Sequence, residues 1–207
     1  PFHVGSLWRD RSFARAACAA LAKRRFDLVQ SHERIACCDV YRAGDGVHAA
    51  WLEQRARIQS PLARWITSRS PHHRYLLAAE RALFTAARLK AVICNSEMVR
   101  GEIRARFGTA DDRLVLIRNA VDGARFHPGV RGEFRDARRG QLRIPAQAAV
   151  FAFVGSGFER KGVASFLRAL ARRREPGWAI IAGKDKRAAD YARLGVKLGI
   201  AGRLLFM

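Results

Sequence analysis

The sequence has few cysteines, and their spacing matches no common metal or redox motif. Its four cysteines include the adjacent pair Cys37-Cys38, and none of them forms a C-x-x-C spacing. This usage argues against a disulfide framework and against a zinc site. We therefore expect Cys18, Cys37, Cys38 and Cys94 to be reduced, buried as small apolar side chains, in a cytoplasmic protein.

Long apolar stretches are also missing. No run approaches the roughly 20 residues that a membrane-spanning helix needs, and no signal peptide is visible. The chain begins at Pro1 without a methionine and stops at Met207 inside the apolar run Leu204-Leu205-Phe206-Met207. A strand cut within its apolar run suggests a piece of a longer protein.

Acidic residues are scarce, with 18 Asp and Glu against 39 Lys and Arg, for a net charge of +21. Such an excess attracts polyanions, whether nucleic acid, anionic lipid or phosphorylated saccharide. The cations are mostly arginines spread along the whole chain, so a bias in base composition explains them as readily as a partner does. A basic nucleic-acid-binding module is the alternative function, but no helix-turn-helix or RNP pattern supports specific nucleic-acid binding.

Neither the G-x-G-x-x-G fingerprint nor the P-loop is present, which argues against a Rossmann-type dehydrogenase. Residues 150–174, VFAFVGSGFERKGVASFLRALARRR, carry a different pattern. The apolar run 150–154 is rich in β-branched and aromatic residues, and predicts a strand buried on both faces. Gly155-Ser156-Gly157 breaks this run, and an amphipathic helix follows from Gly162, with its apolar side formed by Val163, Phe166, Leu167 and Leu170.

A strand, a glycine turn, a cationic pair and a helix start together predict an anion site. Gly155 lets the backbone approach a phosphate, and free amides at a helix N-terminus point toward it. Arg160 adds a forked donor and Lys161 a point charge. The alternative is a surface connection whose two cations only face water.

The segment GSGFERKG and its apolar helix resemble the donor-phosphate loop of retaining, GT-B-fold glycosyltransferases of family 4. The strongest likeness is to the lipopolysaccharide core glucosyltransferases, which add the first glucose to inner-core heptose. The resemblance implies a nucleotide-hexose donor such as UDP-glucose, with Gly155, Arg160 and Lys161 at its diphosphate. No metal or other cofactor is expected, since the sequence has no carboxylate cluster.

Residues 31–51 contain a D-V-Y-x-A-x-D run that begins at Asp39 and ends at Asp45. In the glucosyltransferases a similar run lines the cleft of the N-terminal domain, so the resemblance implies that Asp45 is catalytic. A carboxylate there could bind an acceptor hydroxyl or stabilise an oxocarbenium-like charge. The alternative is that Asp45-Gly46 only forms a turn. His48 has no partner at metal-ligand spacing, so we expect it to be structural.

Residues 51–90 interleave tryptophans with arginines, and Pro61 and Pro71 divide them into helical pieces. This composition suits the interface of an anionic membrane. Relatives carry a similar basic, aromatic segment thought to dock on the inner leaflet, which implies a cytoplasmic protein peripheral at a bacterial inner membrane. Ordinary amphipathic helices with arginines in water are the alternative.

Short strands alternate with helices along the chain. Helices are predicted over 9–25, after the capping pair Asn95-Ser96 up to Gly108, and from Ala188; strands are predicted over 26–30, 91–94, 114–117, 178–183 and from Leu204. The alternation predicts an α/β fold with parallel, doubly wound sheets in both parts. The succession "strand–NSE–helix–G…strand–N-x-V-D…F-x-P" resembles the end of a family-4 N-terminal domain, although Ala120 replaces the usual glycine.

The resemblance therefore implies two Rossmann-like domains in the GT-B arrangement, both incomplete. Residues 1–126 would be the C-terminal part of the acceptor-side domain, and residues 127–207 the first part of the nucleotide-sugar domain. The enzyme would move a hexose, glucose by likeness, to a lipopolysaccharide-core or similar glycan or glycolipid acceptor. The family's N-terminal glycine-rich loop and its paired-glutamate motif are not in the chain, so we expect the chain alone to be inactive.

Overall fold

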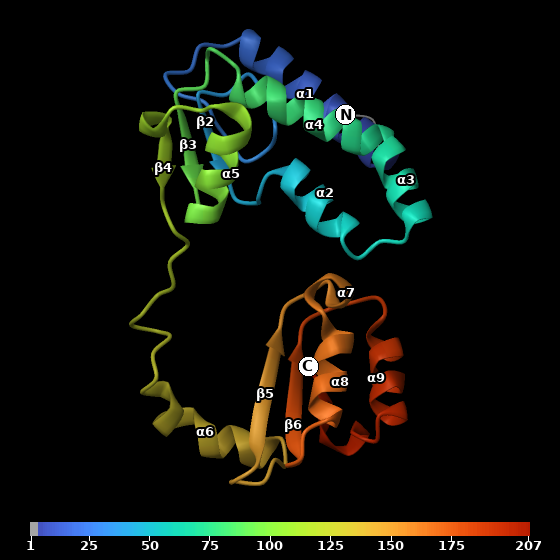
Figure 1. The fold of residues 1–207 in the computed structure, drawn as a ribbon. Helices are drawn as coiled ribbons and strands as arrows, with labels where there is room; N and C mark the ends of the chain where they lie inside the picture. Colours follow the sequence, from blue (N-terminus) through green and yellow to red (C-terminus); the bar gives the residue numbers. More distant parts are fainter. Residues whose placement is uncertain (1–3) are drawn as a thin grey trace. The chain divides into compact units, whose positions relative to one another are not determined.

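The computed structural model describes residues 4–207, which form two compact units, one up to residue 121 and one from residue 122 onward. Both units are α/β, and every pair of neighbouring strands is parallel (Figure 1). The predicted α/β fold with parallel sheets is confirmed. Among the described residues, no helix has the length and apolar character needed to cross a membrane.

The first unit contains a four-stranded sheet in the order β1-β2-β3-β4. Its strands are β1 (Gln30–Ser31), β2 (Val40–Ala43), β3 (Ala91–Cys94) and β4 (Leu114–Leu116). Its helices are α1 (Gly5–Ala22), α2 (His48–Ala56), α3 (Pro61–Arg69), α4 (Pro71–Phe84) and α5 (Glu97–Phe107), with a short 3-10 turn at Asp111–Arg113. The core lies between the sheet and α4 and α5, where Leu83, Val92 and Ile103 are fully buried.

Local sequence explains where several helices of this unit begin and end. Pro61 and Pro71 occupy the first helical positions of α3 and α4, where the missing N–H costs nothing, and the preceding serines cap both helices. Ser96 accepts a hydrogen bond from the Val99 amide at the start of α5, and Gly108 ends that helix at φ 64°. These predicted boundaries are confirmed.

The strand predicted over 26–30 is wrong for most of its length, because β1 begins only at Gln30. Phe26 and Leu28 are exposed, so their apolar character does not reflect burial in a sheet. The amide of Val29 donates to the Asp39 carboxylate at 2.9 Å. This side-chain contact adds to two backbone hydrogen bonds at the same residue, because the Val29 carbonyl accepts from the Asp39 and Val40 amides at 2.8 and 3.0 Å.

The prediction of four reduced thiols is wrong for two of them. Cys18 and Cys37 form a disulfide, whereas Cys38 and Cys94 are free and buried. Cys18 lies on α1 and Cys37 in the segment between β1 and β2. The fold brings α1 against that segment, and this proximity is a tertiary contact that cysteine spacing does not encode.

The second unit contains a three-stranded sheet in the order β5-β6-β7. Its strands are β5 (Ala149–Val154), β6 (Gly177–Ala182) and β7 (Leu204–Phe206). Its helices are α6 (Val130–Gln141), α7 (Phe158–Lys161), α8 (Val163–Ala171) and α9 (Ala188–Lys197), with a 3-10 turn at Ala201–Arg203. Phe158, Leu167 and Ile181 are completely buried in its core.

Strand β5 is not buried on both faces as the apolar run 150–154 predicts. Phe151 and Phe153 pack against the core, while Ala152 and Val154 are exposed, with 73% of Val154 accessible. Side chains alternate along a strand, so one face of β5 packs against the core and the other is open. The polar, arginine-rich residues that precede it contain α6, which has no buried residue.

Candidate functional sites

The glycine turn after β5 has the predicted strand–turn–helix arrangement, with one addition. Gly155, Gly157 and Gly162 have φ values of 129°, 75° and 83°, a region that favours glycine. The one-turn helix α7 lies between Gly157 and Gly162, and α8 starts after it. Helix α7 lies at the carboxyl edge of the sheet (Figure 1), and Arg160 and Lys161 are its last two residues.

Two glycines make this edge compact. A Cβ at Gly155 would overlap the Nζ atom of Lys161, so the lysine side chain folds back over the glycine backbone. A Cβ at Gly183, just after β6, would clash with the carbonyl oxygen of Gly155. The amide of Gly155 donates to the Ala182 carbonyl at 2.8 Å. The ends of β5 and β6 therefore approach closely because neither position has a side chain.

One amide that the pattern predicts to be free already has a partner. The N–H of Phe158, at the start of α7, donates to the Asp185 carboxylate at 2.8 Å. The Arg187 amide donates to the same carboxylate at 2.9 Å. Hydrogen bonds from the Arg187 and Phe158 amides lower the pKa of Asp185, so this carboxylate is ionised at neutral pH. The carboxylate of Asp185 thus already accepts a hydrogen bond from the first amide of α7.

The cationic pair has no such partner. Within residues 4–207, neither Arg160 nor Lys161 forms an ion pair or a side-chain hydrogen bond, and both are exposed. The neighbouring Glu159 pairs with Arg187 at 3.0 Å, so it does not neutralise them. The loop therefore holds Gly155, Arg160 and Lys161 together, with two unpaired positive charges beside a glycine backbone.

Asp45 belongs to the first unit, in the loop of residues 44–47 between β2 and α2. Its carboxylate is exposed and makes no hydrogen bond or ion pair with any residue the structure describes. The Asn95 side-chain amide donates to the Gly44 carbonyl at 2.6 Å and holds the start of the loop. An anchored backbone with a free carboxylate is compatible both with a turn and with a group that contacts substrate.

Two carboxylates, one buried and one partly exposed, hold the other end of this loop. Glu80, on α4, is 2% exposed, and both of its oxygens accept from the His48 amide, at 2.8 and 3.0 Å. It also accepts from Arg34 Nε at 2.9 Å. Glu102, on α5, accepts from the Val47 amide at 3.0 Å. Two carboxylates thus satisfy the first amides of α2, and they fix the loop that carries Asp45.

Sequence reasoning missed Glu80, although its spacing carried a signal. It lies four residues after Leu76 and four before Phe84, on the side of α4 that faces the core. An acidic residue on an apolar helix face needs a buried partner. That partner, Arg34, is distant in sequence, so only the fold identifies it.

Asp39, the first aspartate of the D-V-Y-x-A-x-D run, has a structural environment. It is buried, accepts from the Val29 amide, and pairs with Arg88 at 3.1 Å and Lys90 at 3.7 Å. The Arg88 hydrogen bond and the Val29 amide lower the pKa of Asp39. The two aspartates of the run are therefore different in kind, since only Asp45 is free to meet a ligand.

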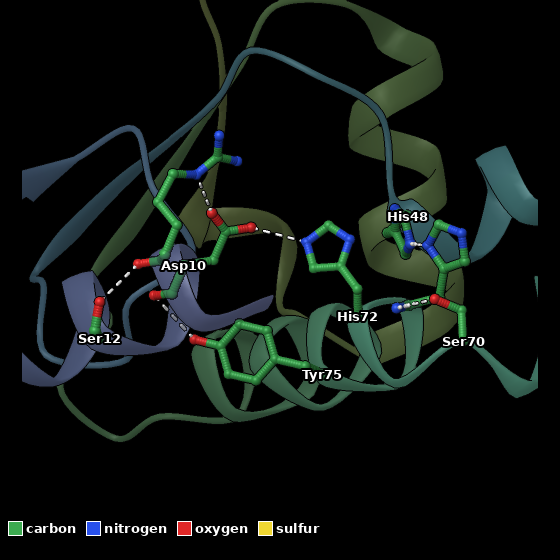
Figure 2. Close-up of polar contacts among 8 residues, drawn as sticks. Asp10, Ser12, His48, Ser70, His72 and Tyr75 are labelled. Atoms are coloured by element: carbon green, nitrogen blue, oxygen red, sulfur yellow. Dashed lines mark hydrogen bonds and ion pairs between the residues drawn. The ribbon is translucent and has the colours of Figure 1, made fainter. Parts of the chain in front are cut away.

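His48 packs in a small cluster of aromatic side chains, part of which Figure 2 shows. Its Nε2 lies 3.1 Å from Nδ1 of His73, and its ring stacks on Trp51 with centroids 5.4 Å apart. Burial, with the nearby His73 charge, lowers the pKa of His48 to about 4. No group of three or more His, Cys, Asp or Glu residues within 4–207 is arranged to hold a metal ion.

The basic, aromatic segment forms α2, α3 and α4, and its most exposed part is α3. No residue of α3 is buried, and its large apolar side chains Leu62, Trp65 and Ile66 are all more than half exposed. The Arg69 guanidinium lies 4.0 Å from the centre of the Trp65 ring. This helix therefore presents an apolar face beside cations, and no described residue of the unit buries it.

Comparison with known proteins gives a consistent result. The family model described as Glycosyltransferase Family 4 matches residues 1–125. The crystal structure of WaaG, a glycosyltransferase involved in lipopolysaccharide biosynthesis, is 22% identical, with a TM-score of 0.79 over 100% of this chain and 55% of WaaG. HepE from Anabaena, solved in complex with UDP and glucose, is 19% identical, with a TM-score of 0.53 over 98% of this chain and 53% of HepE.

These likenesses show the GT-B glycosyltransferase fold, with sheets that are partial in this chain. The chain spans about half the length of either solved relative, 55% of WaaG and 53% of HepE. No curated protein matches it at significance.

Proposed function

Because this chain belongs to Glycosyltransferase Family 4, we propose that it acts in retaining transfer of a hexose, glucose in the first instance, from a nucleotide-sugar donor. The acceptor would be a lipopolysaccharide-core or similar glycan or glycolipid. HepE was solved with UDP and glucose, which supports a UDP-linked donor. The involvement of WaaG in lipopolysaccharide biosynthesis supports the acceptor class.

The observation that carries the donor site is the unpaired cationic pair at the glycine turn. Arg160 and Lys161 have no carboxylate partner in the described chain, and Lys161 folds over the Gly155 backbone. In this proposal they bind the diphosphate and stabilise the negative charge that it gains as it leaves the hexose. This electrostatic role requires no metal ion.

In the other unit, Asp45 would contact the acceptor or the reacting sugar. Its free carboxylate can accept a hydrogen bond from the acceptor hydroxyl or stabilise positive charge on the sugar ring. Glu80 and Glu102 would keep its loop in place through the amides of His48 and Val47.

A titration with UDP tests the donor site on the 207-residue chain. In two-dimensional amide NMR spectra we expect UDP to shift the resonances of Gly155–Gly162, with affinity reduced about tenfold or more in the double variant R160A/K161A, because two charge-assisted contacts are lost. Arg168→Ala, an exposed arginine on α8, is the matched control and should bind like wild type. Equal UDP affinity in the double variant and the control would refute the donor-site assignment.

We propose further that α3 attaches the protein to an anionic membrane surface such as the bacterial inner leaflet, which would make it a peripheral cytoplasmic protein. The proposal is supported by the exposed Leu62, Trp65 and Ile66 beside arginines. Co-sedimentation should be strong with vesicles containing phosphatidylglycerol and weak with phosphatidylcholine alone. Replacing Trp65 and Ile66 by alanine should lower the bound fraction several-fold. Equal binding to both vesicle types would remove the electrostatic part of the proposal.

A further inference from the structure

Helix α1 is attached to the rest of its unit by few contacts. It has no buried residue, and only the small side chains of Ala14, Ala17 and Cys18 pack against the core. Asp10 binds it to α4 by polar contacts: His72 Nε2 lies 2.9 Å from the Asp10 carboxylate, and the Tyr75 hydroxyl donates to the Asp10 carbonyl at 3.4 Å (Figure 2). Besides the backbone, the disulfide between Cys18 and Cys37 links this helix covalently to the rest of the unit.

This helix forms one wall of a cavity of about 460 Å³ in the first unit. Asp10, Phe13 and Ala14 line it from α1, residues 33–35 from the segment after β1, and Tyr75 from α4. Cys18 lies one helical turn beyond Ala14, and Cys37 lies two residues beyond Ile35. The disulfide therefore joins two walls of the cavity at their shared end.

The four cysteines differ in how accessible their sulfur atoms are to reagents in solution. Cys18 and Cys37 are half-buried, whereas Cys38 and Cys94 are fully buried. Burial also raises the pKa of the Cys38 and Cys94 thiols, which lowers the amount of reactive thiolate. A small oxidant or reductant in solution therefore reaches the Cys18–Cys37 pair first.

We propose that Cys18 and Cys37 are a reversible redox clasp that controls whether α1 closes this cavity. The proposal rests on the cytoplasmic location proposed above, because disulfides in reducing compartments are usually transient and redox-sensing. The oxidant is a small disulfide such as glutathione disulfide. The sulfur–sulfur bond of glutathione disulfide breaks, the Cys18–Cys37 bond forms, and the two thiol protons leave with two glutathione thiols. Reduction runs the same exchange in reverse, and the freed α1 separates from residues 33–35. This inference does not depend on the proposed transferase activity.

The clasp is tested on the 207-residue chain, equilibrated with glutathione disulfide or with dithiothreitol. After denaturing alkylation, mass spectrometry should find two modified cysteines in the oxidised protein, Cys38 and Cys94, and four in the reduced protein. Hydrogen exchange of residues 5–22 should become about tenfold faster or more on reduction, with β2 and β3 unchanged. C18S and C37S should behave as the reduced protein under both conditions, and C94A should respond like wild type.

The cavity wall has its own reporter. Burial acts to raise the pKa of Asp10, but hydrogen bonds from His72 and Arg9 lower it overall. NMR titration of the Asp10 carboxyl should give this lowered pKa in the oxidised protein and a rise toward the ordinary value on reduction. Failure of the disulfide to form with glutathione disulfide would overturn the proposal. The proposal would also be overturned if reduction of the disulfide left the hydrogen exchange of α1 unchanged. Reduction of the wild-type protein is enough for this test, even if a serine variant does not fold.

Discussion

The loops of residues 44–47 and 155–157 occupy equivalent places in their units, each between a parallel strand and the helix after it, yet they are fixed by different means. In both, a carboxylate from another segment binds the first helical amides: Glu80 and Glu102 at α2, and Asp185 at α7. In the first unit the main anchor, Glu80, is buried and ionically paired. In the second, glycine conformation and close backbone approach determine the loop.

The difference determines what each loop presents to a ligand. Where distant side chains fix the backbone, the loop itself carries one free anionic group, Asp45. Where glycines fix it, the helix end is left with two free cations, Arg160 and Lys161. Opposite charges at the carboxyl edges of two similar sheets would suit the two roles proposed above, one at a hydroxylated or cationic centre and one at a diphosphate.

Removal of the buried anchor Glu80 is expected to have the largest effect on stability. Glu80→Ala should destabilise the first unit by about 3 kcal/mol, because it leaves Arg34 and the His48 amide without their partner. Urea unfolding followed by amide NMR reports on the two units separately. Only the first unit should unfold with its midpoint at a lower urea concentration. Glu159→Gln, which removes a surface pair with Arg187, is the control and should cost less than about 0.5 kcal/mol. A loss below 1 kcal/mol for Glu80→Ala would mean that the anchor is dispensable.

A glycine substitution gives the matching test in the second unit. Gly183→Ala should cost about 2 kcal/mol, because φ is 147° and the new Cβ would meet the Gly155 carbonyl oxygen, which is backbone and cannot rotate away. Gly140→Ala, within α6 and with open space around it, should instead stabilise by about 0.5 kcal/mol. Unfolding midpoints of this unit provide the comparison, and a neutral Gly183→Ala would show that close approach does not fix the loop.

The smallest expected effect is a pH dependence confined to the first unit. Burial lowers the pKa of His48 to about 4 and also lowers that of His73, so the unfolded chain binds protons first as the pH falls. Stability is therefore fully present above about pH 6.5 and is lost between there and about pH 4. Because the His48 ring is partly exposed, we expect no more than about 1 kcal/mol. His48→Gln should flatten the profile measured by urea unfolding, and a gain in stability toward pH 5 would contradict this assignment.

Local patterns predicted most of the fold correctly. The glycine turn after β5, the proline-started helices α3 and α4, and the Ser96 cap each depend on residues within a few positions of one another. Such features are encoded in backbone preferences and can be read directly. The same holds for the apolar runs of β3 and β6, whose identity as strands is confirmed.

What the sequence did not reveal depends on contacts between distant segments. The Glu80–Arg34 pair joins residues 46 positions apart, and the Cys18–Cys37 disulfide joins α1 to the segment after β1. The Asp185 carboxylate, in the loop after β6, accepts a hydrogen bond from the Phe158 amide. No local periodicity encodes these partners, so the surroundings of the candidate sites could not be predicted from the sequence.

Helix α6 has a practical consequence. It buries no side chain, and its exposed arginines include Arg131 and Arg138. A trypsin-like protease can therefore open the backbone there with little loss of native packing, while the strands on either side stay protected. Brief digestion thus offers a route to preparing the two units of this chain as separate, folded specimens.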